Sequence, residues 1–205
     1  MKVGSWEVNV STTGMPQRIA TAFAGLNEMV GAEYKFIAYL GSQIANGVNH
    51  AVLAEQTLVT GKDIKNVVVV FFRETNDGVT VSGIERVVES GGALGGVAVD
   101  VKTDIPDDAN AAFASAFEGF LGCKVSLIAL LATQVTKGTD YVFVAETEPV
   151  VENPEKSVEL VIVNALTKSV AFVDLLTSKH DTMSLGYAFT WLTRRDTSVA
   201  KPLGE

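Results

Sequence analysis

Residues Ile37 to Val59 read IAYLGSQIANGVNHAVLAEQTLV, and residues Ile128 to Val150, which lie 91 positions further along the chain, read IALLATQVTKGTDYVFVAETEPV. Most of the positions that differ keep their chemical character. A repeat of this length indicates that one structural unit occurs twice, so it has to be recognised before a fold is assigned. The segments are identical at eight positions: Ile37/Ile128, Ala38/Ala129, Leu40/Leu131, Gln43/Gln134, Gly47/Gly138, Ala54/Ala145, Glu55/Glu146 and Val59/Val150.

The repeat extends beyond this segment on both sides. Upstream, Val8 and Val10 stand opposite Val99 and Val101 in the same register. Downstream, the apolar run at 67–72 stands opposite the run at 158–163. We therefore divide the chain of 205 residues into two modules, 1–92 and 93–205, each of an ordinary domain size.

Both modules show the same expected order of one strand, one helix and then a series of strands. Pro16 and Pro106 suit the first turn of a helix, and Asp107 or Asp108 can cap the second helix. One helix packed on a four- to five-stranded antiparallel sheet predicts an α+β fold class for each module. The alternating segments after the helices predict strands at 33–42, 48–59, 65–74, 79–88, 124–133, 139–150, 157–165, 169–176 and 184–193.

Several of these strands are apolar on both faces, as in Val67–Phe72. A sheet that carries a single helix leaves its far face to water and then alternates between apolar and polar residues. We therefore expect the far faces to be covered. The two modules packing back to back or a second copy in a homodimer would provide this cover.

Composition and charge narrow the possible partners. The hydrophobic fraction of 47% is typical of a globular protein with a substantial core. The net charge of −8 argues against nucleic acid as a partner, and the apolar runs are too short to span a membrane. Met1–Lys2 is followed by Gly-Ser-Trp-Glu rather than by an apolar run. No signal peptide is therefore expected, and a cytoplasmic location is favoured unless a leader was removed.

The turn inside the repeat points to a family. It reads Gln43-Ile44-Ala45-Asn46-Gly47 in one copy and Gln134-Val135-Thr136-Lys137-Gly138 in the other. This pattern resembles cystatins, whose first hairpin carries Gln-x-Val-x-Gly before a strand rich in Tyr and Val. The order of one strand, one helix and four strands is also similar. Gly4 and the pair Gly95-Gly96 stand where cystatins have the glycine of their N-terminal trunk.

The resemblance implies a protein that binds another protein through its hairpin tips. In inhibitory cystatins the trunk, the first hairpin and a second hairpin with Pro-Trp form a wedge that fills the cleft of a papain-like cysteine protease. The chain departs from this pattern, because Ala45 and Thr136 replace the central Val. The second hairpins, Asn76-Asp77-Gly78 and Leu166-Thr167-Lys168, contain neither Pro nor Trp.

Two alternatives remain beside protease inhibition: a non-inhibitory structural or assembly module, and an enzyme of the double hot-dog type. We favour a protein that is not an enzyme, with no catalytic residue, cofactor or metal. The two histidines, His50 and His180, and the single Cys123 lack metal-site spacing or a catalytic signature. Glu55 and Glu146 are interpreted as part of a solvated strand face.

Overall fold

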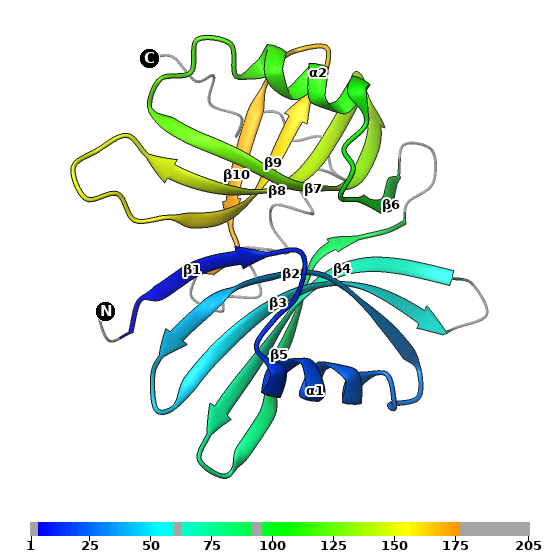
Figure 1. Ribbon diagram of the computed structural model, residues 1–205. Helices are drawn as coiled ribbons and strands as arrows, with labels where there is room; N and C mark the ends of the chain where they lie inside the picture. Colours follow the sequence, from blue (N-terminus) through cyan, green and yellow to red (C-terminus); the bar gives the residue numbers. More distant parts are fainter. Residues whose placement is uncertain (1–3, 60–62, 92–95, 177–205) are drawn as a thin grey trace. The chain divides into compact units, whose positions relative to one another are not determined.

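The computed structural model of the chain describes residues 4–59, 63–91 and 96–176. The chain divides into two compact units, Met1–Val87 and Val88–Glu205. Each unit is built on one five-stranded antiparallel sheet (Figure 1). The strand expected at 184–193 and the trunk residue Gly95 lie outside the described residues.

In unit 1 the strands lie in the sheet in the order in which they follow one another in the sequence, β1-β2-β3-β4-β5. The long β2–β3 pair, which contains the repeated segment, forms the middle of this sheet together with β4. The elements are β1 Trp6–Ser11, α1 Gln17–Leu26, β2 Ala32–Ile44, β3 Val48–Val59, β4 Asp63–Thr75 and β5 Gly78–Glu89.

Unit 2 repeats this arrangement with the sheet order β10-β9-β8-β7-β6, so each strand again lies beside its neighbour in the sequence. Its last two strands are shorter than their counterparts in unit 1. The elements are β6 Val97–Lys102, α2 Asp107–Ala116, β7 Cys123–Thr136, β8 Gly138–Pro149, β9 Ser157–Asn164 and β10 Val170–Asp174.

The predicted α+β class, with one helix packed on a four- to five-stranded sheet in each module, is wrong because the described chain is mostly β. Strands account for 60% of it and helices for 12%. The β2, β3, β4, β7 and β8 strands have 12 to 14 residues, whereas each helix has 10. The sequence pattern underestimates strand length, because polar residues such as Gln43 and Thr136 continue the pairing beyond the apolar alternation.

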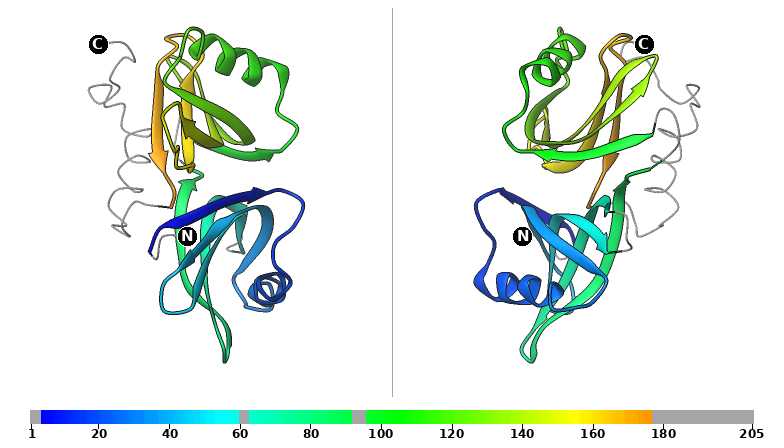
Figure 2. Two further views of the ribbon diagram at one scale, coloured as in Figure 1. Left: turned by 60° about the vertical axis from the view of Figure 1, so that its left-hand side comes forward. Right: turned by 90° about the vertical axis from the view of Figure 1, so that its right-hand side faces the viewer.

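Each short helix contributes to a core on one face of its sheet (Figure 2). In unit 1, Ile19, Phe23 and Leu26 of α1 are buried among strand residues that include Val52 and Phe72. The first turn of α2 differs from the expected cap. Pro106 is the N-cap residue, and Asp108 lies inside the helix, where its Oδ1 accepts a hydrogen bond from the N–H of Ala109 at 2.9 Å.

Both faces of the central strands are buried, as their two-sided apolar pattern predicts. Residues 67–70 of β4 are all at most 1% exposed, and residues 160–163 of β9 are at most 5% exposed. Burying all of these side chains contributes a large part of the stability of each unit, at about 25 cal/mol per Å² of apolar area. Back-to-back packing of the two units, or a homodimer, stays a prediction.

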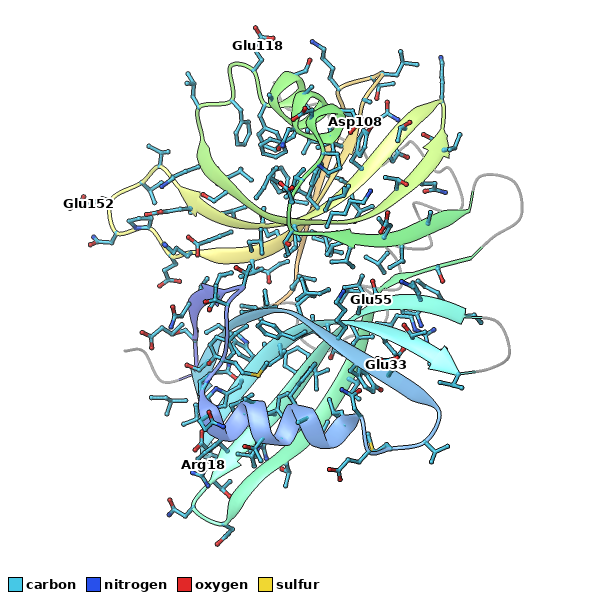
Figure 3. The ribbon with its side chains drawn as sticks, turned by 45° about the vertical axis from the view of Figure 1, so that its right-hand side comes forward. Arg18, Glu33, Glu55, Asp108, Glu118 and Glu152 are labelled. Atoms are coloured by element: carbon cyan, nitrogen blue, oxygen red, sulfur yellow. The ribbon has the colours of Figure 1, made fainter. Side chains whose placement is uncertain are left out.

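The repeated glutamates do not lie on a solvated strand face. The Glu55 side chain, labelled in Figure 3, is 11% exposed, and that of Glu146 is 22% exposed. Each carboxylate forms an ion pair with a lysine at the equivalent position, Lys65 in β4 at 3.1 Å and Lys156 directly before β9 at 2.7 Å. The identity of these positions in the two copies is therefore explained by a structural ion pair.

Candidate functional site

Three segments that are far apart in the sequence meet at one end of each sheet (Figure 1). In unit 1 they are the start of the chain at Gly4, the β2–β3 turn at 45–47 and the β4–β5 turn at 76–77. The N–H of Gly4 donates to the carbonyl oxygen of Ile44 at 3.1 Å. Val48 pairs with Glu74 across β3 and β4, which brings the two turns together. We call this end of each unit its hairpin end.

A row of polar side chains fixes the hairpin end of unit 1. Gln43 donates from Nε2 to the carbonyl oxygen of Gly4 at 2.8 Å and accepts a bond on Oε1 from Asn49 at 3.0 Å. Arg73 donates from Nε to Asn49 Oδ1 at 3.4 Å. The side chain of Gln43 therefore holds the start of the chain against the first turn.

The backbone of the β2–β3 turn requires glycine at one position. Gly47 has a φ of +105°, and a Cβ atom there would lie 2.5 Å from the carbonyl oxygen of Glu74. Asn46 also has a positive φ, of 49°, which asparagine tolerates better than most residues. Next to this constrained turn, the apolar side chain of Ile44 is 42% exposed.

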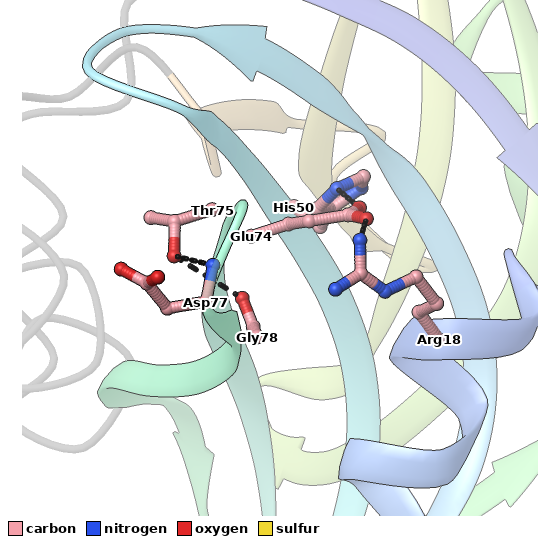
Figure 4. Close-up of polar contacts among 6 residues, drawn as sticks. All are labelled: Arg18, His50, Glu74, Thr75, Asp77 and Gly78. Atoms are coloured by element: carbon pink, nitrogen blue, oxygen red, sulfur yellow. Dashed lines mark hydrogen bonds and ion pairs between the residues drawn. The ribbon is translucent and has the colours of Figure 1, made fainter.

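On the helix side of the sheet, a chain of four polar residues connects α1 to the hairpin end. Figure 4 shows three of them, Arg18, Glu74 and His50. Arg18 of α1 forms a 2.5 Å ion pair with Glu74 Oε1, and Glu74 Oε2 lies 3.2 Å from His50 Nε2. His50 Nδ1 lies 2.9 Å from the hydroxyl oxygen of Tyr39. With Glu74 ionised, the neutral ring donates from Nε2 and accepts at Nδ1. His50 therefore positions Glu74 beside the second turn.

The environment of His50 predicts that unit 1 loses stability in mild acid. Burial lowers the pKa of His50 from its usual 6.5, and the nearby Glu74 carboxylate opposes this shift. A depressed pKa means that the folded form binds the proton less tightly than the unfolded chain. The histidine therefore contributes stability above pH 6.5 that is lost as the pH falls through the folded-state pKa.

We expect the stability of unit 1 to decrease between about pH 7 and about pH 5.5, where Asp and Glu side chains are mostly still ionised. The His50→Gln variant should show a smaller decrease, because it removes the titrating ring. Hydrogen exchange of the β3 amides at both pH values measures this stability. His180 is present in the natural chain and in the variant, so the difference between their pH dependences is due to His50. Equal pH dependence in the two proteins would contradict the prediction.

Asn164, the last residue of β9, organises the hairpin end of unit 2. Its Nδ2 donates to Asp140 Oδ1 at 2.6 Å, to Thr136 Oγ1 at 3.3 Å and to the carbonyl oxygen of Lys137 at 3.4 Å. Its Oδ1 accepts bonds from the N–H groups of Leu166 and Thr167 at 3.0 and 2.7 Å. One side chain, 9% exposed, thus connects both turns of unit 2.

Two exposed apolar residues lie at the turns that Asn164 connects, Val135 next to the end of β7 and Leu166 in the β9–β10 turn. Val135 is 70% exposed and Leu166 is 61% exposed. Gly138 has a φ of +102°, and a Cβ atom there would lie 2.8 Å from the Cβ of Leu166, so the two turns are in close contact. The hairpin end of unit 2 therefore presents an exposed apolar side chain at each of its two turns, and the turns are in contact and share the bonds of Asn164.

The ring at the position of His50 in unit 2 is Tyr141, which also connects a strand to the helix. Its hydroxyl group donates to Asp108 Oδ2 at 2.9 Å, and Asp108 lies in the first turn of α2 (Figure 3). Burial, together with the adjacent Asp108, raises the pKa of Tyr141. In both units, therefore, a ring on the third strand connects that strand to the start of the helix: His50 of β3 through Glu74 and Arg18, and Tyr141 of β8 through Asp108.

The described residues of the predicted site lie at the hairpin ends, but some are exposed to solvent and others are buried or bonded within the unit. Ile44, Val135 and Lys137 are exposed, whereas Gln134 is buried and Gln43 is half-buried with its side chain turned to Gly4. Gly96 directly precedes β6, whose first residue pairs with Gln134. The exposed apolar residues, rather than the two glutamines, are available for contact.

Sequence reasoning missed several residues that shape these ends: Arg18, Glu74 and Asn164. Arg18 lies 56 positions from Glu74, and no local pattern predicts that pair. Asn164 follows an apolar strand and precedes a turn, and this position favours asparagine. That signal was present in the sequence, although it did not indicate how many bonds the side chain would make.

The described residues contain no group of three or more His, Cys, Asp or Glu side chains placed to hold a metal ion. Within the same residues, no helix is long and apolar enough to cross a membrane. No protein-family model matches the sequence, and the search of curated proteins finds no matching protein.

Proposed function

We propose that the chain is a protein-binding protein and that each unit binds its partner through the hairpin end. The observation that carries this proposal is the exposure of apolar side chains on or directly beside turns that are fixed by contacts within each unit. Ile44, Val135 and Leu166 are 42%, 70% and 61% exposed. Ile44 lies at the hairpin end of unit 1, and Val135 and Leu166 lie together at that of unit 2. Neighbouring exposed apolar groups, as in unit 2, are typical of surfaces that bind other proteins.

The rigidity of the turns supports the proposal as much as their exposure does. Gly47 and Gly138 fit against neighbouring turns where a Cβ atom has no room, and Asn164 connects both turns of unit 2. A binding surface that is already in its bound shape loses little conformational entropy on association. The rigid hairpin ends therefore suit a partner with a complementary groove.

Inhibition of a papain-like cysteine protease is the second candidate function, and one observation favours it. The start of the chain at Gly4, the first turn and the second turn lie side by side at one end of unit 1. The wedge of inhibitory cystatins consists of three segments of this kind and enters the protease cleft without presenting a scissile bond. Because the second turns lack Pro and Trp, the aromatic anchors that dominate many interfaces are missing, and we expect weak inhibition at best.

A titration of papain with the full chain tests this second candidate. Inhibition that appears at micromolar concentration and is lost in an Ile44→Asp/Val135→Asp variant is the expected result. If papain keeps its full activity throughout that range, the inhibitory function is excluded, and protein binding through the hairpin ends has to be tested separately.

The general proposal is tested by selecting binders from a library of random peptides displayed on phage. The Ile44→Asp/Val135→Asp variant should bind the selected peptides at least about tenfold more weakly, because burying an aliphatic side chain contributes about 1.5–3 kcal/mol. Ile84→Asp in β5 is the matched control, since Ile84 is 38% exposed and lies outside both turns. Equal weakening by the variant and the control would refute binding at the hairpin ends.

A further inference from the structure

The hairpin ends of the two units differ in charge. The first turn carries Asn46 in unit 1 and Lys137 at the equivalent position of unit 2. The second turn carries Asp77 in unit 1 and Lys168 in unit 2. All four residues are exposed. The repeat therefore preserves the sheet, whereas the turns carry one aspartate in unit 1 and two lysines in unit 2 at these equivalent positions.

The two lysines of unit 2 belong to one organised surface. The carbonyl oxygen of Lys137 accepts a bond from Asn164 Nδ2 at 3.4 Å, and the N–H of Lys168 donates to the carbonyl oxygen of Asn164 at 2.9 Å. Both lysine backbones are thus fixed to the same residue. Val135 lies in β7 two residues before Lys137, and Leu166 lies in the second turn two residues before Lys168, so exposed apolar and cationic groups occur together at this end.

Among the described residues of unit 2, no acidic side chain pairs with the two lysines of this surface. In the described part of the chain, the side chains of Lys137 and Lys168 form no ion pair. The nearest carboxylate of the network, on Asp140, is half-buried and accepts a 2.6 Å bond from Asn164. Both ammonium groups are therefore available to a partner, on a chain whose net charge is −8.

We propose that the hairpin end of unit 2 binds an acidic peptide segment that presents an apolar side chain. This inference rests on the proposed function and specifies the partner of unit 2. The apolar side chain packs against Val135 and Leu166, while carboxylates on either side of it approach Lys137 and Lys168. Opposite charges at the edge of such a contact add modest affinity and mainly select the partner and accelerate association.

The test uses the full chain and a phage-displayed library of short random peptides. Selection should enrich peptides with Asp or Glu next to an aliphatic or aromatic residue. The Lys137→Glu/Lys168→Glu variant should bind the best peptide at least about tenfold more weakly, and raising the salt from about 50 mM to about 500 mM should weaken binding to the natural chain. A Val135→Asp variant should lose binding as well.

The matched control is Lys102→Glu/Lys124→Glu, which changes the net charge equally but lies away from the hairpin end of unit 2. It should bind the peptide like the natural chain, and circular dichroism verifies that both variants are folded. If the selected peptides are neutral and their binding depends on Val135 but not on the two lysines, this inference is wrong and the proposed function still holds. Acidic peptides that bind without an apolar residue would overturn it as well. If no peptide is selected, or if the Val135→Asp variant binds the peptides as well as the natural chain does, the result would count against the proposed function itself.

Discussion

The Asn164→Ala variant is expected to lower the free energy of unfolding of unit 2 by about 3 kcal/mol. Its side chain bonds Asp140, Thr136 and the main chain of both turns, and it is 9% exposed. Alanine removes all of these bonds at once. Each lost bond contributes about 1 kcal/mol net, and a buried group left without a partner costs about 1–3 kcal/mol. The partly exposed turns regain some bonds from water, which limits the total.

Hydrogen exchange of the β8 and β9 amides measures this effect on unit 2 separately from unit 1. Asn110→Ala in α2 is the matched control, because the exposed Asn110 makes one side-chain bond, to the carbonyl oxygen of Ile105 at 2.9 Å. We expect the control to cost less than about 1 kcal/mol. If the β8 and β9 amides exchange at the same rates in the two variants, the role assigned to Asn164 is wrong.

The strands were the most predictable part of the fold. The bounds of β3, Val48–Val59, agree with the prediction because a glycine turn begins the strand and an alternating apolar pattern runs along it. The irregular pairing of β2 with β3, at Phe36/Ala38 and at Tyr39/Gly41, could not be predicted. A bulge changes which residues face the helix, and a pattern with a period of two residues does not show where it occurs.

The fold class was wrong for a related reason. The apolar stripes of the helices are easily recognised, but they span only ten residues each. The strands continue through polar residues such as Ser42 and Gln43, whose pairing depends on partners elsewhere in the chain. Sequence patterns therefore identified the right elements but underestimated how much of the chain the sheets contain.

Comparison of the two copies separates the scaffold from the candidate site. The ion pairs of Glu55 with Lys65 and of Glu146 with Lys156 occupy equivalent positions. The bond from the N–H of Val59 to the oxygen of Gly31 is also repeated, by Val150 and Gly122. At the hairpin ends, by contrast, Arg73 occupies the position of Asn164. The glycines of the first turns, Gly47 and Gly138, are identical in the two copies, whereas the polar residue that follows the apolar run beside the turns, Arg73 or Asn164, differs between the units.

The Gly47→Ala variant is expected to destabilise unit 1 by about 3 kcal/mol and to weaken any binding through its hairpin end. Two effects combine at this position. The φ of +105° is unfavourable for a residue with a Cβ atom, and the added atom would lie 2.5 Å from the carbonyl oxygen of Glu74. That oxygen belongs to the backbone of β4, so it moves only if the second turn moves with it.

The Gly31→Ala variant separates these two effects within the same unit. Gly31 has a similar φ of +111°, but nothing lies within 4 Å of a Cβ atom built there. We expect this variant to cost about 1 kcal/mol, from the backbone conformation alone. Hydrogen exchange of the β3 and β4 amides compares the two variants, and papain or a selected peptide reports the effect on binding. Because both substitutions carry the same conformational penalty, any additional loss in Gly47→Ala measures how closely the two turns pack. If Gly47→Ala costs no more than Gly31→Ala, the turns are free to move apart and the hairpin end is not rigid.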